Sequence, residues 1–157
     1  MARILGPAIF TGTVASLAST AALALLARSQ GKAAVQPTNS TSHWLHGDKA
    51  ALVRRIDAAH TGVGYATHHA SAIFWALTFH WWLSRRPPGS PARLLRDASV
   101  MTAIATTVDY VMTPKRLTPG WEEVLPKKSI ALAYVAFAVG LTIGALASQP
   151  PRKDQNR

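Results

Sequence analysis

The stretch Ile130–Ala147, IALAYVAFAVGLTIGALA, contains 18 residues and no charge. A helix needs about 20 mostly apolar residues to cross a bilayer, because each residue adds 1.5 Å. This stretch and its flanks are therefore typical of a transmembrane helix. It also contains Gly140-x3-Gly144, a spacing of small residues that lets two helices approach closely. We interpret the two glycines as packing residues, either within the chain or at the face of a homodimer.

Three further segments of the 157-residue chain are predominantly apolar, at residues 4–27, 62–83 and 94–112, and the last is the weakest because its apolar part is short and contains Asp109. The basic start and apolar stretch of the first also suit a cleaved signal peptide, but the stretch is longer than the roughly 7–15 apolar residues of such a peptide. We therefore expect an all-α integral membrane protein, a four-helix bundle with spans at 4–27, 62–83, 94–112 and 130–147. These spans form one domain over residues 1–148, and the polar tail at 149–157 is predicted to be disordered.

The connections between the spans differ in character. Residues 28–47 are rich in Ser, Thr, Gln and Asn, which is typical of a flexible loop. Residues 48–60 place their apolar side chains on one helical face, so we expect a short interfacial amphipathic helix there, or a helical extension of the second span. The pair Pro119-Gly120 predicts a type II turn.

The charge is positive but sparse. The chain carries 17 Lys and Arg against 7 Asp and Glu, a formal charge of +10, yet only 15% of its residues are charged. A soluble domain has about 25% charged residues. The basic residues fall on both predicted membrane faces, where they would contact anionic lipid headgroups, so we expect no nucleic-acid partner. The absence of cysteine excludes disulfides, thiolate metal sites and a cysteine nucleophile.

Orientation is weakly encoded. Four spans place eight Lys and Arg residues on the side of the termini and nine on the other side. Positive charge in short loops marks the cytoplasmic side. We place both termini in the cytoplasm because four arginines lie within the short second connection and its flank, at residues 85–96.

Ionisable side chains inside the predicted spans form the candidate site. Such residues are costly in a membrane and are functional candidates for that reason. At 100° per residue, Tyr65 and His69 share a helical face, and Asp109 lies at a similar depth in the third span. We therefore expect Asp109 to hydrogen-bond His69 or His68, with Tyr65 nearby, while Arg116 reaches toward the same carboxylate by snorkelling.

This cluster of Tyr65, His68, His69, Asp109 and Arg116 permits several interpretations. The first interpretation is a buried polar contact that fixes the register of the helices. The second is a proton or ion pathway, and the third is a metal site using His68, His69 and Asp109. Adjacent histidines diverge by 100° and the spacing matches no standard metal motif. No cofactor is favoured, because haem needs two axial ligands on different helices and the histidines within the spans all lie in the second. No nucleophile motif is present, so we expect no enzymatic activity.

The stretch 109–122, DYVMTPKRLTPGWE, resembles an element D-Y…R-L-T-P-G-W-E found in a family of small uncharacterised bacterial inner-membrane proteins. The resemblance covers some 14 residues, with a looser match in the histidine-bearing span. It implies a multi-pass protein of the bacterial inner membrane and assigns no chemistry.

These observations predict a non-enzymatic accessory or interaction subunit that contacts the lipid bilayer and either a membrane-protein partner or a second copy of itself. The alternatives are a small proton-coupled transporter and a metal- or cofactor-binding membrane subunit, each using the same cluster.

Overall fold

The computed structural model describes residues 2–148, and this part of the chain is all-helical, without strands. The predicted all-α class is confirmed. The tail predicted to be disordered, residues 149–157, lies outside the described residues. The four long helices are α1 (Ala2–Ser29), α4 (Val63–Arg85), α5 (Pro91–Thr107) and α6 (Lys127–Ala147).

Helix α5 begins with two recognisable signals. The Ser90 side chain accepts a hydrogen bond from the backbone N–H of Arg93, and Pro91 occupies the first turn. At its other end α5 continues into a π-helical turn, η3 (Val108–Met112), so that residues 91–112 form one helical run. All four helical runs lie within three residues of the predicted segments.

Two helical segments of the described chain are long and apolar enough to cross a membrane, Ile4–Ser29 and Lys127–Ala147. The sequence predicts four. Helix α5 is short by this measure, at 17 residues, and α4 carries three histidines that lower its hydropathy.

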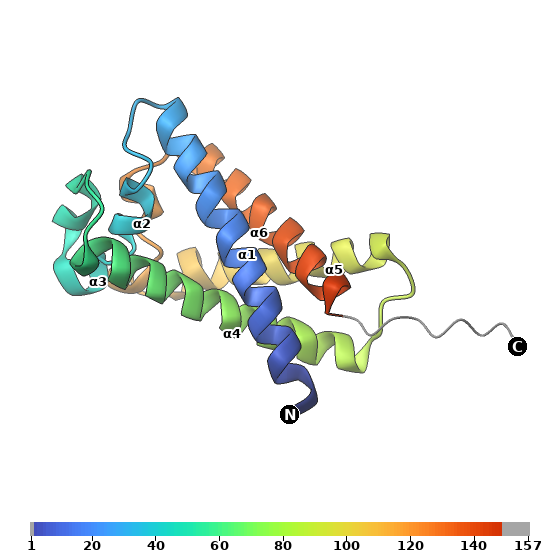
Figure 1. Cartoon of the computed structure of the whole chain (residues 1–157). Coiled ribbons are helices and arrows are strands. Elements are labelled where there is room, and N and C mark those ends of the chain that lie inside the picture. The colour runs from blue at the N-terminus through green and yellow to red at the C-terminus, as the bar shows by residue number, and fades with distance from the viewer. Residues whose placement is uncertain (1, 149–157) are drawn as a thin grey trace, which may run out of the picture.

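The helices cross instead of forming a bundle with nearly parallel axes. Helices α1 and α6 lie side by side and run in opposite directions, whereas α4 crosses α1 steeply (Figure 1). Helix α5 packs against α6. Near the turn that joins α4 to α5, the buried side chains of Phe79, Leu94 and Ala98 belong to one hydrophobic core.

Glycines bring α1 into backbone contact with two helices. A Cβ atom on Gly140 would lie 2.6 Å from Cα of Ala15, and one on Gly144 would lie 2.7 Å from Cα of Thr11. On the α4 side, a Cβ on Gly12 would lie 2.6 Å from Cα of an isoleucine of that helix. The Gly140 and Gly144 stripe therefore packs α6 against α1 of the same chain.

The connections at residues 30–62 and 113–126 fold together over one end of the helices, and we call them the cap (Figure 1). The Trp121 indole N–H donates to Thr41 Oγ1 at 3.1 Å, and His43 Nε2 lies 2.9 Å from the carbonyl oxygen of Thr118. The cap contains short helical pieces: α2 (Gln36–Ser40), α3 (His43–His46), η1 (Asp48–Leu52), η2 (Ala58–Gly62), η4 (Lys115–Leu117) and η5 (Trp121–Glu123).

The structure of the cap contradicts two expectations drawn from the sequence. Residues 28–47 are not a loose loop, because α2 and α3 form there and the side chains of residues 39–43 are buried. The prediction of one amphipathic helix at residues 48–60 is wrong, because the residues between η1 and η2 are not helical. The Asn39 amide donates to the carbonyl oxygens of Val53 and Arg55, at 2.9 and 3.0 Å, and these bonds hold the chain out of a helix.

Asp57 starts the helical run that follows. Its backbone is extended, and its carboxylate accepts a hydrogen bond from the backbone N–H of His60 at 2.6 Å. This bond, more than the nearby side chains of His60 and Arg55, holds the pKa of Asp57 below its ordinary value.

The predicted turn at Pro119-Gly120 also forms. Gly120 has φ +78° and ψ −2°, the values required of the second central residue of a type II turn. A Cβ at Gly120 would lie 2.5 Å from the carbonyl oxygen of Ser40, so the turn also allows the two parts of the cap to touch.

We predict that Gly144→Ala lowers the free energy of unfolding of the purified protein by about 1–3 kcal/mol, because the added methyl group collides with the α1 backbone. Chemical denaturation in detergent measures the change. Gly6→Ala is the matched control, since nothing lies within 4 Å of a Cβ at Gly6. Equal stability of Gly144→Ala and the parent chain would show that α1 and α6 are not in backbone contact.

Candidate functional site

A cavity of about 300 Å³ lies beneath the cap, between α4, the α5–η3 run and α6. Ligand pockets in proteins begin at about this size. Its walls combine aromatic, hydroxyl and ionisable side chains. The lining residues are Thr41, Trp44, Thr67, His68, Ser71, Ala72, Trp75, Ala105, Asp109, Leu117, Thr118, Pro119, Trp121, Tyr134 and Phe137.

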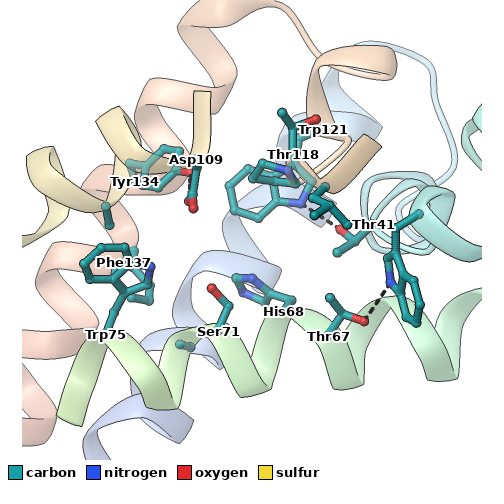
Figure 2. A pocket seen from close by; sticks show the side chains of 15 residues that line it. Thr41, Thr67, His68, Ser71, Trp75, Asp109, Thr118, Trp121, Tyr134 and Phe137 are labelled. Carbon is teal, nitrogen blue, oxygen red and sulfur yellow. Dashed lines mark hydrogen bonds between the residues drawn. The ribbon is translucent and has the colours of Figure 1, made fainter. Parts of the chain in front are cut away.

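Three polar side chains face one another across this cavity. Figure 2 shows the carboxylate of Asp109 pointing from one wall toward the hydroxyl of Ser71 and the ring of His68 on the α4 wall. The cavity therefore brings together two members of the predicted cluster, His68 and Asp109, and adds Ser71.

The predicted hydrogen bond between Asp109 and a histidine does not form. The Tyr134 hydroxyl donates to Asp109 Oδ2 at 2.6 Å, and this tyrosine comes from α6. Asp109 has no ion-pair partner among the described residues. Arg116 does not reach it, because Arg116 Nε donates to the backbone carbonyl of Trp44 at 3.3 Å. The neighbouring Lys115 pairs with Glu123 instead, at 3.5 Å.

The three histidines of α4 are instead paired with hydroxyl groups of α1. This arrangement follows from the close crossing of the two helices, which places α1 hydroxyls where the longer imidazoles can reach them. The pairs are His68 Nε2 with Ser19 Oγ at 2.9 Å, His69 Nδ1 with Ser16 Oγ at 2.8 Å, and His80 Nε2 with Thr11 Oγ1 at 2.9 Å.

The hydrogen bonds of Ser19 bear on the tautomer of His68. A serine hydroxyl has one hydrogen, and Ser19 donates it to the backbone carbonyl of Ala15 at 2.9 Å. With its hydrogen on a backbone carbonyl, Ser19 can accept from His68, and in that arrangement Nε2 carries the proton. In the neutral ring this leaves Nδ1 as a hydrogen-bond acceptor.

Five aromatic side chains line the cavity: Trp44, Trp75, Trp121, Tyr134 and Phe137. The indole N–H of Trp44 donates to Thr67 Oγ1 at 3.2 Å, and that of Trp121 is held by the cap. The polar edges of these two indoles are therefore already used within the protein.

The remaining predicted residues lie outside the cavity. Tyr65 stacks on His69 with ring centroids 5.6 Å apart, and Arg116 lies in the cap. Sequence reasoning missed Tyr134, Ser71 and the tryptophans. Tyr134 could have been found from the sequence, because its hydroxyl is a polar group within an otherwise apolar helix. It lies near the end of α6 that adjoins η3.

The structure does not assemble the metal site considered from sequence. No group of three or more His, Cys, Asp or Glu side chains within residues 2–148 is arranged to hold a metal ion. The ring nitrogens of His68 and His69 that bond α1 belong to two separate contacts, and Asp109 bonds neither.

No protein-family model matches the chain, and no curated protein and no solved structure is significantly similar to it. The site is therefore interpreted from its own geometry.

We predict that a double-mutant cycle between Ser16→Ala and His69→Ala gives a coupling of about 1 kcal/mol in the free energy of unfolding, the usual size of one hydrogen bond. The cycle between His69→Ala and Asp109→Asn serves as the control. We expect its coupling to stay below about 0.5 kcal/mol, since the two groups share no contact. A larger coupling in the second cycle would restore the histidine–aspartate pairing predicted from sequence.

Proposed function

We propose that this chain is an integral membrane protein of four spans, located in a bacterial inner membrane, that binds a small molecule in its sub-cap cavity and works as a non-enzymatic accessory subunit. The observation that carries the proposal is the inverted polarity of the structure. The ionisable side chains of His68 and Asp109 line the cavity, with Ser71 at its exposed rim, while many large apolar side chains lie on the outer surface.

The outer surfaces of α1 and α6 support membrane insertion. Both helices expose a series of large apolar side chains, and a soluble protein rarely leaves so extended an apolar surface open. The exposed residues are Leu5, Ile9, Phe10, Leu17 and Leu25 on α1, and Leu132, Val135, Val139, Ile143 and Leu146 on α6.

The end of α4 away from the cap supports an interfacial position. Arg85 lies over the ring of Trp81 at 4.8 Å, and Arg86 lies over the ring of Trp82 at 5.4 Å. Tryptophan and arginine at a helix end are typical anchors at the membrane–water boundary. The position of this pair favours α4 as a spanning helix, although its mean hydropathy is lower than that of α1 and α6.

We propose that helix α1 is retained as part of the fold. Its loss would leave three α4 histidines without their hydroxyl partners and would uncover Gly140 and Gly144. These contacts support an uncleaved first span.

A binding role is favoured over a transport path. Between His69 and His80, the inner face of α4 is closed by Ala72 and Ala76, which are 1% and 0% exposed, and by backbone contact with Gly12. The cavity thus ends within the protein. The resemblance of residues 109–122 to small bacterial inner-membrane proteins supports the location, and an accessory role accords with the absence of a nucleophile motif.

We predict opposite membrane sides for Lys49→Cys in the cap and Gly89→Cys in the α4–α5 turn, both exposed positions in a chain that has no cysteine of its own. With cytoplasmic termini, a membrane-impermeant maleimide applied to spheroplasts should label Lys49→Cys at once and Gly89→Cys only after permeabilisation. The cysteine-free parent chain is the control.

Labelling of both positions from the same side would contradict four spans. It would leave α1 and α6 as the only spans, with residues 30–126 together on one face. The reverse labelling pattern would keep four spans and invert the orientation.

A further inference from the structure

The cavity holds a carboxylate that nothing in its walls neutralises. Asp109 is the one acidic residue among the lining residues, and neither lysine nor arginine is among them. The basic residues nearest in sequence, Lys115 and Arg116, are engaged elsewhere in the cap. A carboxylate within a membrane span is costly unless it is protonated or meets a positive partner.

Three atoms in the cavity are free to contact a ligand. Asp109 uses Oδ2 for the bond with Tyr134, and its Oδ1 makes no hydrogen bond with the described residues. The Ser71 hydroxyl likewise has no partner there, and it lies on the exposed rim of the cavity. The Nδ1 atom of neutral His68 is an acceptor. The free groups are thus a carboxylate oxygen, an imidazole nitrogen and a hydroxyl, a set that favours positive charge and N–H donors.

The aromatic walls point to the same class of ligand. With its indole N–H bonded to Thr67, Trp44 has mainly its ring face left to offer. Trp121 donates to Thr41, and its ring packs against His68 and Tyr134, with ring centroids 5.4 and 5.5 Å apart, so that it forms part of the aromatic wall. Trp75 and Phe137 enclose the opposite part of the cavity (Figure 2). Aromatic faces attract cations, tryptophan most strongly, and aromatic cages are a common means of holding alkylammonium groups.

We propose that the cavity binds a small organic monocation, an alkyl- or arylammonium compound, with its charged nitrogen beside Asp109 and its apolar part against the aromatic side chains. This inference rests on the proposed function, because it assigns a ligand class to the same cavity. The volume of about 300 Å³ limits the ligand to a small molecule.

Two pairs of probes separate charge from shape. Choline and 3,3-dimethyl-1-butanol have the same outline and differ in the positive charge, as do 2-phenylethylammonium and 2-phenylethanol to a close approximation. Isothermal titration calorimetry on the full chain in detergent should give tighter binding of the cation in at least one pair, by about tenfold or more.

Two variants test the assignment to Asp109. In Asp109→Asn, which keeps an acceptor for the Tyr134 hydroxyl, we expect the cation to lose its advantage over the neutral probe. Asp97→Asn is the matched control. It removes the same charge from the same helical run, α5–η3, but Asp97 pairs with Arg96 at 2.8 Å and does not line the cavity, so the affinity should be unchanged.

A further pair of variants ties binding to the cavity without touching the carboxylate. Ser71→Phe fills the exposed rim and should abolish binding of every probe. Ala70→Phe adds the same ring at the neighbouring exposed position, which does not line the cavity, and should leave binding intact. Unchanged thermal midpoints establish that each variant is folded.

The outcomes separate this inference from the proposed function. If neutral and cationic probes bind equally and Ser71→Phe removes both, the cavity binds small molecules but not through charge, and the inference is overturned alone. If no probe binds the parent chain, both proposals fail. A charge preference that survives Asp109→Asn would overturn the role given to this carboxylate.

Discussion

The close contact of α1 with α4 and α6 is the constraint on which the rest of the structure depends. It exists because Gly12, Gly140 and Gly144 present no side chain where the backbones meet. At this separation Ser16 and Ser19 of α1 lie within hydrogen-bonding distance of the α4 imidazoles, so packing and polar pairing reinforce each other. Wider helix separation would leave these partly buried imidazoles without their hydroxyl partners.

The cavity forms because the cap separates the helices at one end while they pack together at the other. Helices α4 and α5 share a core near their joining turn, whereas at the other end the cap inserts Trp121 between α4 and α6. Two glycines allow the cap to settle there. Gly64 lets α4 touch the carbonyl oxygen of Thr38, and Gly120 adopts a left-handed conformation against the Ser40 backbone. The polar and aromatic lining is therefore set by segments far apart in the sequence.

Much of the helical framework could be predicted from the sequence, while the site could be predicted only in part. Apolar runs bounded by Pro, Gly and Arg placed the long helices, and Pro119-Gly120 placed its turn. His68 and Asp109 were found as site members because a charge or imidazole within an apolar run stands out. Their partners were misassigned, since depth and helical face restrict which side chains can meet without choosing among neighbouring helices.

The sequence by itself determined the helices, the small-residue stripes and the presence of ionisable groups inside apolar runs, because these depend on local periodicity and composition. Only the tertiary structure decided that the histidines bond α1 hydroxyls, that Asp109 bonds Tyr134, and that residues 48–60 do not form one helix. Each of these depends on which helices are neighbours and on long-range side-chain bonds, such as those from Asn39. Helix crossing is fixed by the fit of entire surfaces, which no single stretch of sequence contains.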